Sequence, residues 1–529
     1  MSSDYRQDQP YGAFLHRELS VSWLVLALRL AGRHQLDLNQ GRFSLLEFGC
    51  GHGLNLLFNA AAHPEASFYG VDRHPTHVAQ ARQRAKDLGL TNVHVALADL
   101  RDFADGPPRR GEAATWPQEH ELVVAHGVAS WVSADTRAAL LQAAACHLRP
   151  GGVFYCSYNT YPGWLARSPL QMLALELGLQ EGGNTSEASL QRACGWLKAL
   201  LGGSAQASPL GRNLPELQPY LDRLDQTPAG YRMGEFQAAH QPLYVGPMQR
   251  DCASHGLLPI GTATLPELFP ELLDPRRRQL LEQAESAAQR EVLLDLLIHQ
   301  GFRRDLYAKG VVPPVPALWQ QELVALPVLL RRDGLAQRQA IDCSFGSMGL
   351  DAALMTALEQ ALQAGHCALG ELAAHLGLSW RELLPLMALL LHADLIGVDV
   401  CCDSGAAPDA IDAFNQQLIE RAAVNGGLGG LLAPALRLPL ALSDLQILLA
   451  QSETMDLEPA DRLAVVWMGM QMAGLWVESA AGEPLLEEQA ALERLQELER
   501  ALESRGVLAE LRRWRDPEAL FRVNSQPVP

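Results

Sequence analysis

The sequence lacks a surplus of positive charge, a Cys-x-x-Cys pair and a long uninterrupted apolar run. Its 42 lysine and arginine residues stand against 60 acidic residues, which gives a formal net charge of −18. The overall field of such a protein repels nucleic acid. Its nine cysteines are scattered along the chain, which argues against both a disulfide framework and a structural zinc site. We therefore expect neither a nucleic-acid partner nor a bound metal.

The sequence also shows no pattern typical of a targeting segment or a membrane-spanning segment. Residues 1–20 have no basic start followed by an apolar core, so they do not resemble a signal peptide. The most apolar stretch, ELLPLMALLLHADLIGV, is interrupted by Pro385, His392 and Asp394 and is too short to cross a bilayer. We expect a cytoplasmic protein that does not insert into a membrane.

What the chain does contain is a change of pattern near residue 180. Before it, short apolar strands alternate with amphipathic helices, which is typical of an α/β fold with a mostly parallel sheet. After it the strand signal fades, and beyond residue 350 three helices around a tight LGLS turn predict a winged-helix-like layout. The third of these helices carries only Arg381 as a cation, so the layout favours packing or protein contact over DNA binding.

The stretch SLLEFGCGHGLN, residues 44–55, places Gly49, Gly51 and Gly53 directly after an apolar strand. A phosphate loop would continue with lysine and a hydroxyl residue, whereas Gly53 is followed by Leu54. The same Leu54 weakens a dinucleotide fingerprint, because a third glycine belongs near that position. S-adenosylmethionine has no phosphate and needs the glycines only so that the backbone can lie against it.

Three acidic residues and one amide accompany the loop. Glu47 precedes it and suits the ammonium and sulfonium charges of S-adenosylmethionine, and Asp72 can accept from both ribose hydroxyls. Asp99 follows the next strand and can accept from the adenine amino group. Asn55 either caps the following helix or binds the ligand carboxylate. We therefore predict S-adenosylmethionine as the cofactor, with a nicotinamide dinucleotide as the alternative, because Asp72 would suit its ribose too.

The motifs EFGCGHG, YGVD and ALADL resemble the successive motifs of class I S-adenosylmethionine-dependent methyltransferases. More specifically, QPYGAF and residues 125–164 resemble the methyltransferases that carry a methyltransferase regulatory domain. This group includes the rickettsial outer-membrane-protein lysine methyltransferases. The resemblance extends over residues 5–165 and, more loosely, 230–310. It implies a Rossmann-like domain with a mostly parallel seven-stranded sheet, a mostly helical regulatory domain and a winged-helix-like C-terminal domain, over residues 1–180, 181–315 and 316–529.

Aromatic residues gather where the methyl acceptor should enter. His126 ends the fourth strand and offers either its carbonyl to the cofactor or its imidazole to the acceptor, and SYNTYPGW crowds three aromatics around a turn. Aromatic faces stabilise a methylated cation, and a desolvating pocket lowers the pKa of a lysine. The predicted catalytic residues are His126, Tyr158 and Tyr161, and the predicted substrate-binding residues are Trp131, Asn159 and Trp164.

Some of these assignments have open alternatives. Tyr11 is predicted to fold over the cofactor as a lid and His126 to contact it, while ordinary packing is the alternative for His126 and Trp131. Where the resembling family tends to have an aromatic residue before Ser-Trp, this sequence has Ala129. A substrate different from that of the family is therefore open.

The expected reaction is transfer of a methyl group from S-adenosylmethionine to a protein lysine by in-line attack, in which the enzyme mainly positions and desolvates the reactants. One alternative is a small-molecule methyltransferase whose extra domains serve as lid and dimer contact, so that a homodimer is an open state. Another is a non-catalytic regulatory protein that senses the cofactor. The intact set of Glu47, Asp72 and Asp99 disfavours the last alternative.

Overall fold

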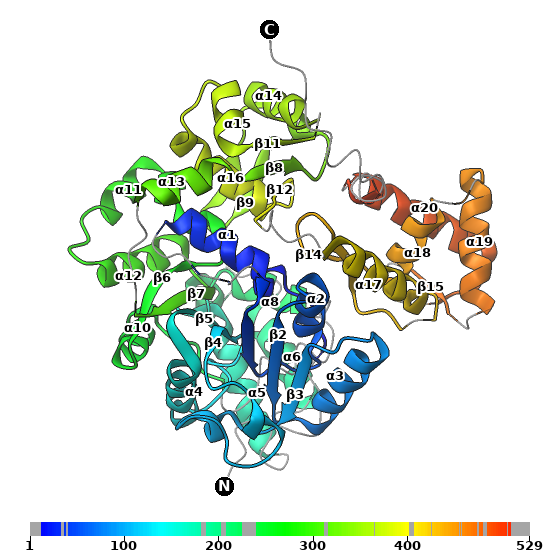
Figure 1. Cartoon of the computed structure of the whole chain (residues 1–529). Coiled ribbons are helices and arrows are strands. Elements are labelled where there is room, and N and C mark those ends of the chain that lie inside the picture. Colours follow the sequence, from blue (N-terminus) through cyan, green and yellow to red (C-terminus); the bar gives the residue numbers. More distant parts are fainter. Residues whose placement is uncertain are drawn as a thin grey trace.

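The structure is a computed structural model of the 529-residue chain (Figure 1). Tyr11, the predicted lid residue, lies outside the residues that the structure describes. These are 12–32, 36, 38, 41–180, 187–202, 208–224, 240–310, 316–363, 365–400, 407–424, 426–453, 455, 457–472, 475–479, 484–504, 506–508 and 511.

A seven-stranded sheet with the order β3-β2-β1-β4-β5-β7-β6 forms the centre of the molecule. β1 to β5 pair in parallel, and β7 runs antiparallel to both of its neighbours, so the expected mostly parallel sheet is confirmed. The strands are β1 (Ser44–Phe48), β2 (Ser67–Asp72), β3 (Val93–Leu97), β4 (His120–Ala125), β5 (Leu148–Asn159), β6 (Leu257–Thr262) and β7 (Phe302–Lys309).

The last two strands come from a segment that the sequence suggested to be mostly helical, residues 181–315. β7 reads FRRDLYAK, and the polar run Arg303-Arg304-Asp305 hides its strand pattern. Pairing with β5 buries Arg303 and Asp305 beneath the sheet, where they bind each other. A buried ion pair therefore replaces the apolar alternation by which a strand is normally detected.

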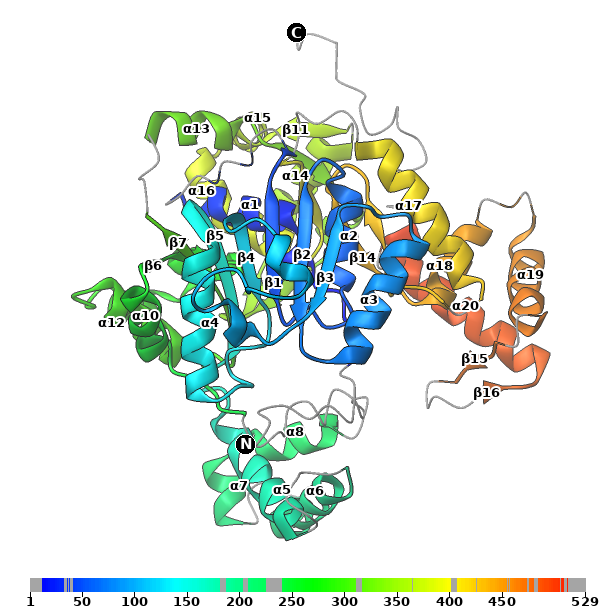
Figure 2. The same cartoon turned by 60° about the horizontal axis from the view of Figure 1, so that its bottom comes forward.

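Helices cover both faces of the sheet, and the strands are buried on each side (Figures 1 and 2). Leu45 and Val124 pack on the face covered by α1, whereas Leu46 and Val123 pack on the face covered by α4. Burial on both faces explains why the strands read as continuous apolar runs. The flanking elements are η1 (Arg17–Leu19), α1 (Val21–Ala31), α2 (Leu54–Ala62), α3 (Pro75–Asp87), η3 (Leu100–Phe103), η4 (Glu112–Thr115), α4 (Ala134–His147), α10 (Val245–Ser254), η6 (Leu265–Leu268), η7 (Pro270–Leu272), α11 (Pro275–Leu281) and α12 (Ala287–Ile298).

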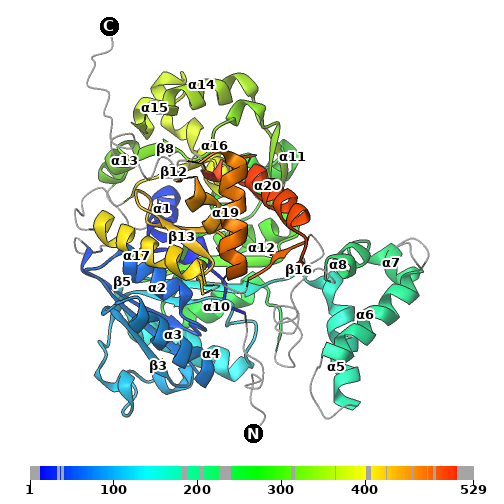
Figure 3. The same cartoon turned by 90° about the vertical axis from the view of Figure 1, so that its right-hand side faces the viewer.

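Between β5 and α10 the chain forms a small helical lobe that stands apart from the sheet (Figures 2 and 3). The lobe has a hydrophobic cluster of its own, which includes Leu170, Leu190 and Leu221. Its elements are η5 (Leu165–Arg167), α5 (Ser168–Gln180), α6 (Glu187–Leu201), α7 (Pro209–Asn213) and α8 (Leu217–Leu224).

A second region, from α13 to β12, packs against α1 and shares its hydrophobic core. A small sheet of order β11-β8-β12 lies beside three helices there, and the winged-helix-like description of this region stays a prediction. The elements are α13 (Pro316–Val324), β8 (Pro327–Leu330), η8 (Leu335–Gln337), β9 (Ala340–Cys343), β10 (Gly346–Gly349), α14 (Ala352–Gln363), β11 (His366–Ala368), α15 (Leu369–His375), α16 (Trp380–His392) and β12 (Ile396–Val398).

The last region packs on the opposite end of the sheet layer, where Phe414 meets Phe58 of α2 edge to face with 5.2 Å between ring centroids. Within the described residues, no helix is both long enough and apolar enough to cross a membrane. The elements are α17 (Ala407–Ala422), β13 (Gly430–Ala433), β14 (Leu438–Ala441), α18 (Asp444–Ser452), α19 (Pro459–Met472), β15 (Val477–Glu478), β16 (Pro484–Leu485) and α20 (Glu488–Ser504).

Candidate functional site

The glycine loop between β1 and α2 lies at the carboxyl edge of the sheet, where ligands bind in open α/β folds. Gly49, Gly51 and Gly53 all have positive φ, at 74°, 54° and 72°. Gly49 must be a glycine because a Cβ there would stand 2.6 Å from Val128 of the β4 loop, and Gly53 because a Cβ would stand 2.9 Å from Ala81 of α3. A Cβ on Gly51 would meet no atom within 4 Å. Gly51 is therefore the glycine that faces open space.

Asp72, at the end of β2, is tied directly to this loop. Its carboxylate accepts from the backbone N–H of Gly51 at 2.9 Å and from that of His74 at 2.8 Å. The imidazole Nδ1 of His77 lies 3.4 Å from the same carboxylate. Burial alone would raise the pKa of Asp72, but these hydrogen bonds outweigh it and hold the pKa below its usual value. Asp72 is thus an ionised carboxylate at the open end of the loop.

Glu47 is the second carboxyl group at the loop, and it is only 4% exposed. Burial, reinforced by the charge of Asp72, raises the pKa of Glu47 to about 8. None of the ion pairs among the described residues involves Glu47. A buried carboxyl of this kind favours a cationic ligand, whose charge would stabilise the carboxylate form.

Asp99 lies beyond β3, at the N-terminus of η3. Its carboxylate accepts from Arg101 three times, from the backbone N at 3.0 Å, from Nε at 3.0 Å and from Nη2 at 2.7 Å. The hydrogen bond from the Arg101 side chain is the main reason why the pKa of Asp99 lies below its usual value. Asp99 is therefore largely engaged by its own turn, in contrast to Asp72.

Asn55 holds the N-terminal segment onto α2. Its Oδ1 accepts from the backbone N–H of His16 at 3.0 Å, so it does not cap α2, whose N-cap is Gly53. One turn further on, Asn59 accepts from the backbone of Val21 at 3.0 Å and donates to the carbonyl of Leu19 at 2.9 Å. Two asparagines thus fasten residues 16–21 to the first turns of α2, directly after the cofactor loop.

His126 follows β4, on the sheet face that carries Tyr155 and Ser157 of β5. Its Nδ1 lies 3.0 Å from the Tyr155 hydroxyl and 3.1 Å from Ser157 Oγ. The ring of His16 stands 4.2 Å away between centroids, and that of Phe302 5.9 Å away. Burial, followed by the influence of His16 and Arg304, holds the pKa of His126 well below its usual value, so both histidines are neutral at pH 7.

Tyr158 points to the opposite face of the sheet and is fully buried. Its hydroxyl donates to Asp305 Oδ2 at 2.7 Å, and Arg303 binds the other oxygen of that carboxylate at 2.9 Å. Because side chains alternate along a strand, Tyr158 cannot reach His126. We therefore do not place Tyr158 among the reacting groups and describe it as part of a buried polar network.

Trp131, Asn159 and Trp164 are brought together, and the residue that joins them is His240. The rings of Trp131 and Trp164 lie 4.9 Å and 4.6 Å from that of His240, and Asn159 Nδ2 lies 2.8 Å from His240 Nε2. Burial lowers the pKa of His240 to about 4, so its imidazole is neutral. The sequence offered no spacing that links His240 to this cluster.

Tyr161 lies in the same loop, before a cis peptide bond to Pro162. Its ring is 4.9 Å from that of Tyr244, which is half exposed, and its backbone N–H donates to Leu243 at 3.0 Å. Gly163 N donates to Gln300 O at 2.8 Å. Backbone bonds from two distant segments thus fix this loop and leave the Tyr161–Tyr244 pair at the surface.

Comparisons with known proteins bear on the class of enzyme. Residues 46–154 match the family described as "Methyltransferase domain", and residues 234–309 match the "Predicted methyltransferase regulatory domain". The solved structure of PKMT2 from Rickettsia typhi in complex with AdoHcy superposes with a TM-score of 0.64 at 17% identity, covering 96% of this chain and 99% of that one. The chain is a class I S-adenosylmethionine-dependent methyltransferase.

Two uncharacterized bacterial relatives extend the comparison. One, from Synechocystis, is 29% identical to this methyltransferase over 364 residues, which cover 67% of this chain and 68% of that protein. The other, from Rickettsia prowazekii, is 27% identical over 184 residues, which cover 35% of this chain and 68% of that protein. The match of residues 46–154 to the methyltransferase domain confirms the expected enzyme class and cofactor, and the nicotinamide alternative is set aside.

The residues at the loop fit S-adenosylmethionine. Gly51 leaves space that a side chain would fill, Asp72 presents an ionised carboxylate beside it, and Glu47 supplies a buried carboxyl group suited to a cation. Gly51 would lie with its backbone against the cofactor, Asp72 would bind the ribose, and Glu47 would lie near the positive charges. The individual assignments stay predictions, those of Asn55, Asp99 and His126 included.

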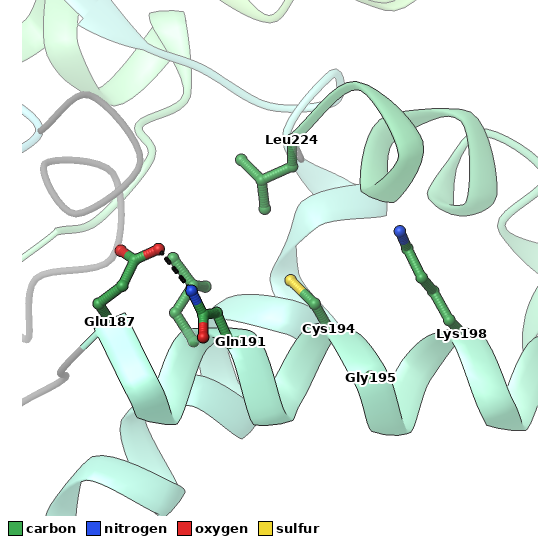
Figure 4. Close-up of a pocket in the computed structure, with 7 residues that line it drawn as sticks. Glu187, Gln191, Cys194, Gly195, Lys198 and Leu224 are labelled. Carbon is green, nitrogen blue, oxygen red and sulfur yellow. Dashed lines mark hydrogen bonds between the residues drawn. The ribbon is translucent and has the colours of Figure 1, made fainter. Parts of the chain in front are cut away.

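The methyltransferase has a further pocket of about 330 Å³ in the helical lobe, between α6 and α8 (Figure 4). Glu187, Cys194 and Lys198 of α6 face Leu224 of α8 across it, and Gln191 donates to Glu187 at 3.3 Å. None of the predicted site residues lines this pocket. The lobe that holds this pocket stands apart from the sheet in Figure 3.

Proposed function

We propose that this methyltransferase transfers the methyl group of S-adenosylmethionine to the side-chain amine of a protein lysine. The observation that carries the proposal is the lining of aromatic rings and neutral imidazoles beside the cofactor loop. His16, His126 and Phe302 form one partly exposed ring cluster there, and Tyr161 with Tyr244 forms another. The fold shared with the rickettsial PKMT2 and the sequence resemblance to lysine methyltransferases also support it.

The chemistry needs a neutral amine, because an ammonium group has no lone pair with which to attack. The bound cofactor supplies an activated methyl group, and transfer forms the N–CH3 bond as the S–CH3 bond breaks. His16 and His126 are neutral, so they solvate the amine without adding a competing charge. Partial burial among these rings disfavours the charged form of the amine, whose proton leaves to solvent.

The loop of Asn159 to Trp164 would orient the acceptor chain rather than react with it. His240 holds Trp131 and Trp164 in place, and the half-exposed Tyr161 and Tyr244 rings offer flat apolar surfaces to the aliphatic stem of a lysine. Aromatic faces also attract the methylated ammonium that forms. We assign substrate contact to Tyr161 and Trp131, and a positioning role to Asn159 and Trp164.

The same proposal includes the expected organisation of the protein. We propose domain boundaries after residues 180 and 315, and a cytoplasmic location. Hydrophobic cores cross both boundaries, since α1 shares a core with α16 and the sheet draws β6 and β7 from the second segment. The segments would therefore act as one enzyme rather than as independent units.

Labelling of a lysate tests the proposal. Lysate from cells that lack the enzyme is incubated with purified protein and S-adenosylmethionine that carries a tritiated methyl group. Acid hydrolysis of the labelled proteins should release tritiated ε-N-methyllysine. Label confined to small molecules would favour the small-molecule alternative, and label on another amino acid would overturn the lysine assignment. The Gly51→Arg variant, which is expected to lose the cofactor, gives the background.

A further inference from the structure

Two opposite charges lie beside the proposed acceptor site, and no sequence motif singles them out. Arg304 of β7 lies opposite Ser157 of β5 in the strand register, and the Ser157 hydroxyl in turn contacts the imidazole of His126. Its guanidinium carbon lies 4.9 Å from the ring centroid of Phe302, which in turn contacts the ring of His126. Arg304 therefore belongs to the wall that the neutral histidines form.

The guanidinium of Arg304 makes few polar contacts for a partly buried cation. Its Nη1 donates to Thr264 Oγ1 at 3.3 Å, and its Nε is buried without a hydrogen-bond partner among the described residues. No carboxylate lies within 4 Å of it in the described part of the chain. Its charge is therefore not cancelled by a direct ion pair and acts on its surroundings.

Glu18 supplies the opposing charge from the N-terminal segment. It lies two residues after His16, and its carboxylate is 3.6 Å from Arg17 Nε. Burial raises the pKa of Glu18, but Arg304 and Arg17 outweigh this effect, so Glu18 is ionised. The titratable and charged groups around this site are Arg17, Glu18 and His16 of the N-terminal segment, His126, Tyr155, Glu267, Arg304 and His392.

We propose that Arg304 and Glu18 are positioning charges of opposite sign that set how readily the acceptor amine gives up its proton. The inference rests on the proposed function, because only an amine acceptor has to lose a proton before attack. A nearby cation disfavours an ammonium group, and a nearby carboxylate favours it. Arg304 therefore raises the neutral fraction of the amine at a given pH, and Glu18 limits that gain.

Removal of Arg304 and removal of Glu18 should shift the pH dependence of methyl transfer in opposite directions. The rate of methyl transfer rises with pH as the amine loses its proton. Removal of Arg304 should move this rise to higher pH by about one pH unit, which is about tenfold in rate on the acidic side. Removal of Glu18 should move it to lower pH by a similar amount. A loss of structure would instead lower the rate at every pH, without an opposite pair of shifts.

The experiment measures initial rates of ε-N-methyllysine formation between pH 6 and pH 10. The probe is total protein from cells that lack the enzyme, with saturating tritiated S-adenosylmethionine. The variants are Arg304→Gln, Arg304→Lys and Glu18→Gln. Arg276→Gln, which removes an exposed arginine of α11, is the matched control. The dissociation constant of S-adenosylmethionine, measured by calorimetry for each variant, reports on the cofactor half.

Opposite shifts for Arg304→Gln and Glu18→Gln, with the profile of Arg304→Lys and Arg276→Gln unchanged, would support the inference. Methyllysine formation with coincident pH profiles in all variants would overturn it and leave the proposed function intact. Shifts of the same sign for both charge removals would overturn it as well. Transfer that produces no methyllysine, even with wild-type enzyme, would overturn the lysine proposal and this inference with it.

Discussion

The proposed cofactor half and the proposed acceptor half of the site share one edge of the sheet, but they are assembled in different ways. The cofactor half takes Glu47, Gly51 and Asp72 from consecutive strand ends, and a single hydrogen bond joins the last two. The acceptor half takes residues from the N-terminal segment, the β4 and β5 loops, residues 240–244 and β7. Its residues meet only when these distant segments have folded together.

The two halves also differ in charge. The cofactor half presents carboxyl groups, which suits a ligand with an ammonium and a sulfonium group. The acceptor half presents neutral imidazoles, aromatic rings and Arg304, which suits an amine that arrives without its proton. Under the proposed function, the enzyme holds one cation and neutralises another, and it gains from keeping these environments on separate strands.

The largest expected effect comes from filling the space at Gly51. Gly51→Arg should weaken S-adenosylmethionine binding by a factor of about 100 or more, because the new side chain would occupy the cofactor space. Gly89→Arg is the matched control: Gly89 has a similar φ of 65° and equally open surroundings, so it carries the same backbone strain. Calorimetric titration of both variants checks the prediction. Equal weakening in both would assign the loss to strain and remove the loop from the site.

A smaller effect distinguishes the two aspartates. Asp72→Asn should weaken cofactor binding by about 10- to 100-fold, the range expected for loss of hydrogen bonds to a charged group. Asp99→Asn should cost only a few-fold, because Arg101 already engages that carboxylate. Titration of the cofactor product S-adenosylhomocysteine measures both. Equal losses would show that Asp99 takes part as fully as Asp72.

A further effect, smaller than that of Asp72→Asn, concerns the buried Glu47. Its pKa of about 8 means that the empty site holds a proton at neutral pH, and a bound cation must displace it. Cofactor affinity should therefore rise about fivefold between pH 7 and pH 8 relative to Glu47→Gln, a ratio that cancels ionisation of the ligand itself. Proton release, measured by calorimetry in buffers of different ionisation enthalpy, gives a second reading. An unchanged ratio would show that Glu47 carries no proton.

Glu47 also makes a prediction about stability without cofactor. A carboxyl whose folded pKa lies above its unfolded pKa of 4.5 costs stability as the pH rises from 4.5 to 8. Glu47→Gln should therefore unfold at a higher temperature than wild type at pH 8 and at nearly the same temperature at pH 4.5.

The residues of the cofactor half could be predicted from the sequence more completely than those of the acceptor half. Glu47, Gly51 and Asp72 could be predicted because each follows a short apolar strand, and parallel strand ends meet at one edge. The seven-stranded sheet could be expected from the resemblance, but β7 could not be seen in the pattern, since its buried Arg303 and Asp305 break the apolar alternation.

Only some residues of the acceptor half could be predicted from the sequence. The sequence singled out Trp131 and Trp164 as aromatic, but not His240, which stands between them and lies more than 75 residues further along the chain, in the segment that resembles the regulatory domain. Tyr158 was expected beside Tyr161, and strand alternation sends it to the other face of the sheet. Asn55 was expected at the ligand or the helix cap; it does not cap α2 and accepts from the backbone of His16, while its contact with the ligand stays a prediction.

The separation of the two halves is tested by measuring methyl transfer and cofactor binding in one variant. His240→Ala removes the ring between Trp131 and Trp164 without touching the cofactor loop. Methyl transfer to protein should fall by a factor of about three or more, while the dissociation constant of S-adenosylmethionine, measured on the same preparation, stays within about twofold of wild type. A dissociation constant that rises in proportion to the loss of transfer would contradict the separation of the two halves.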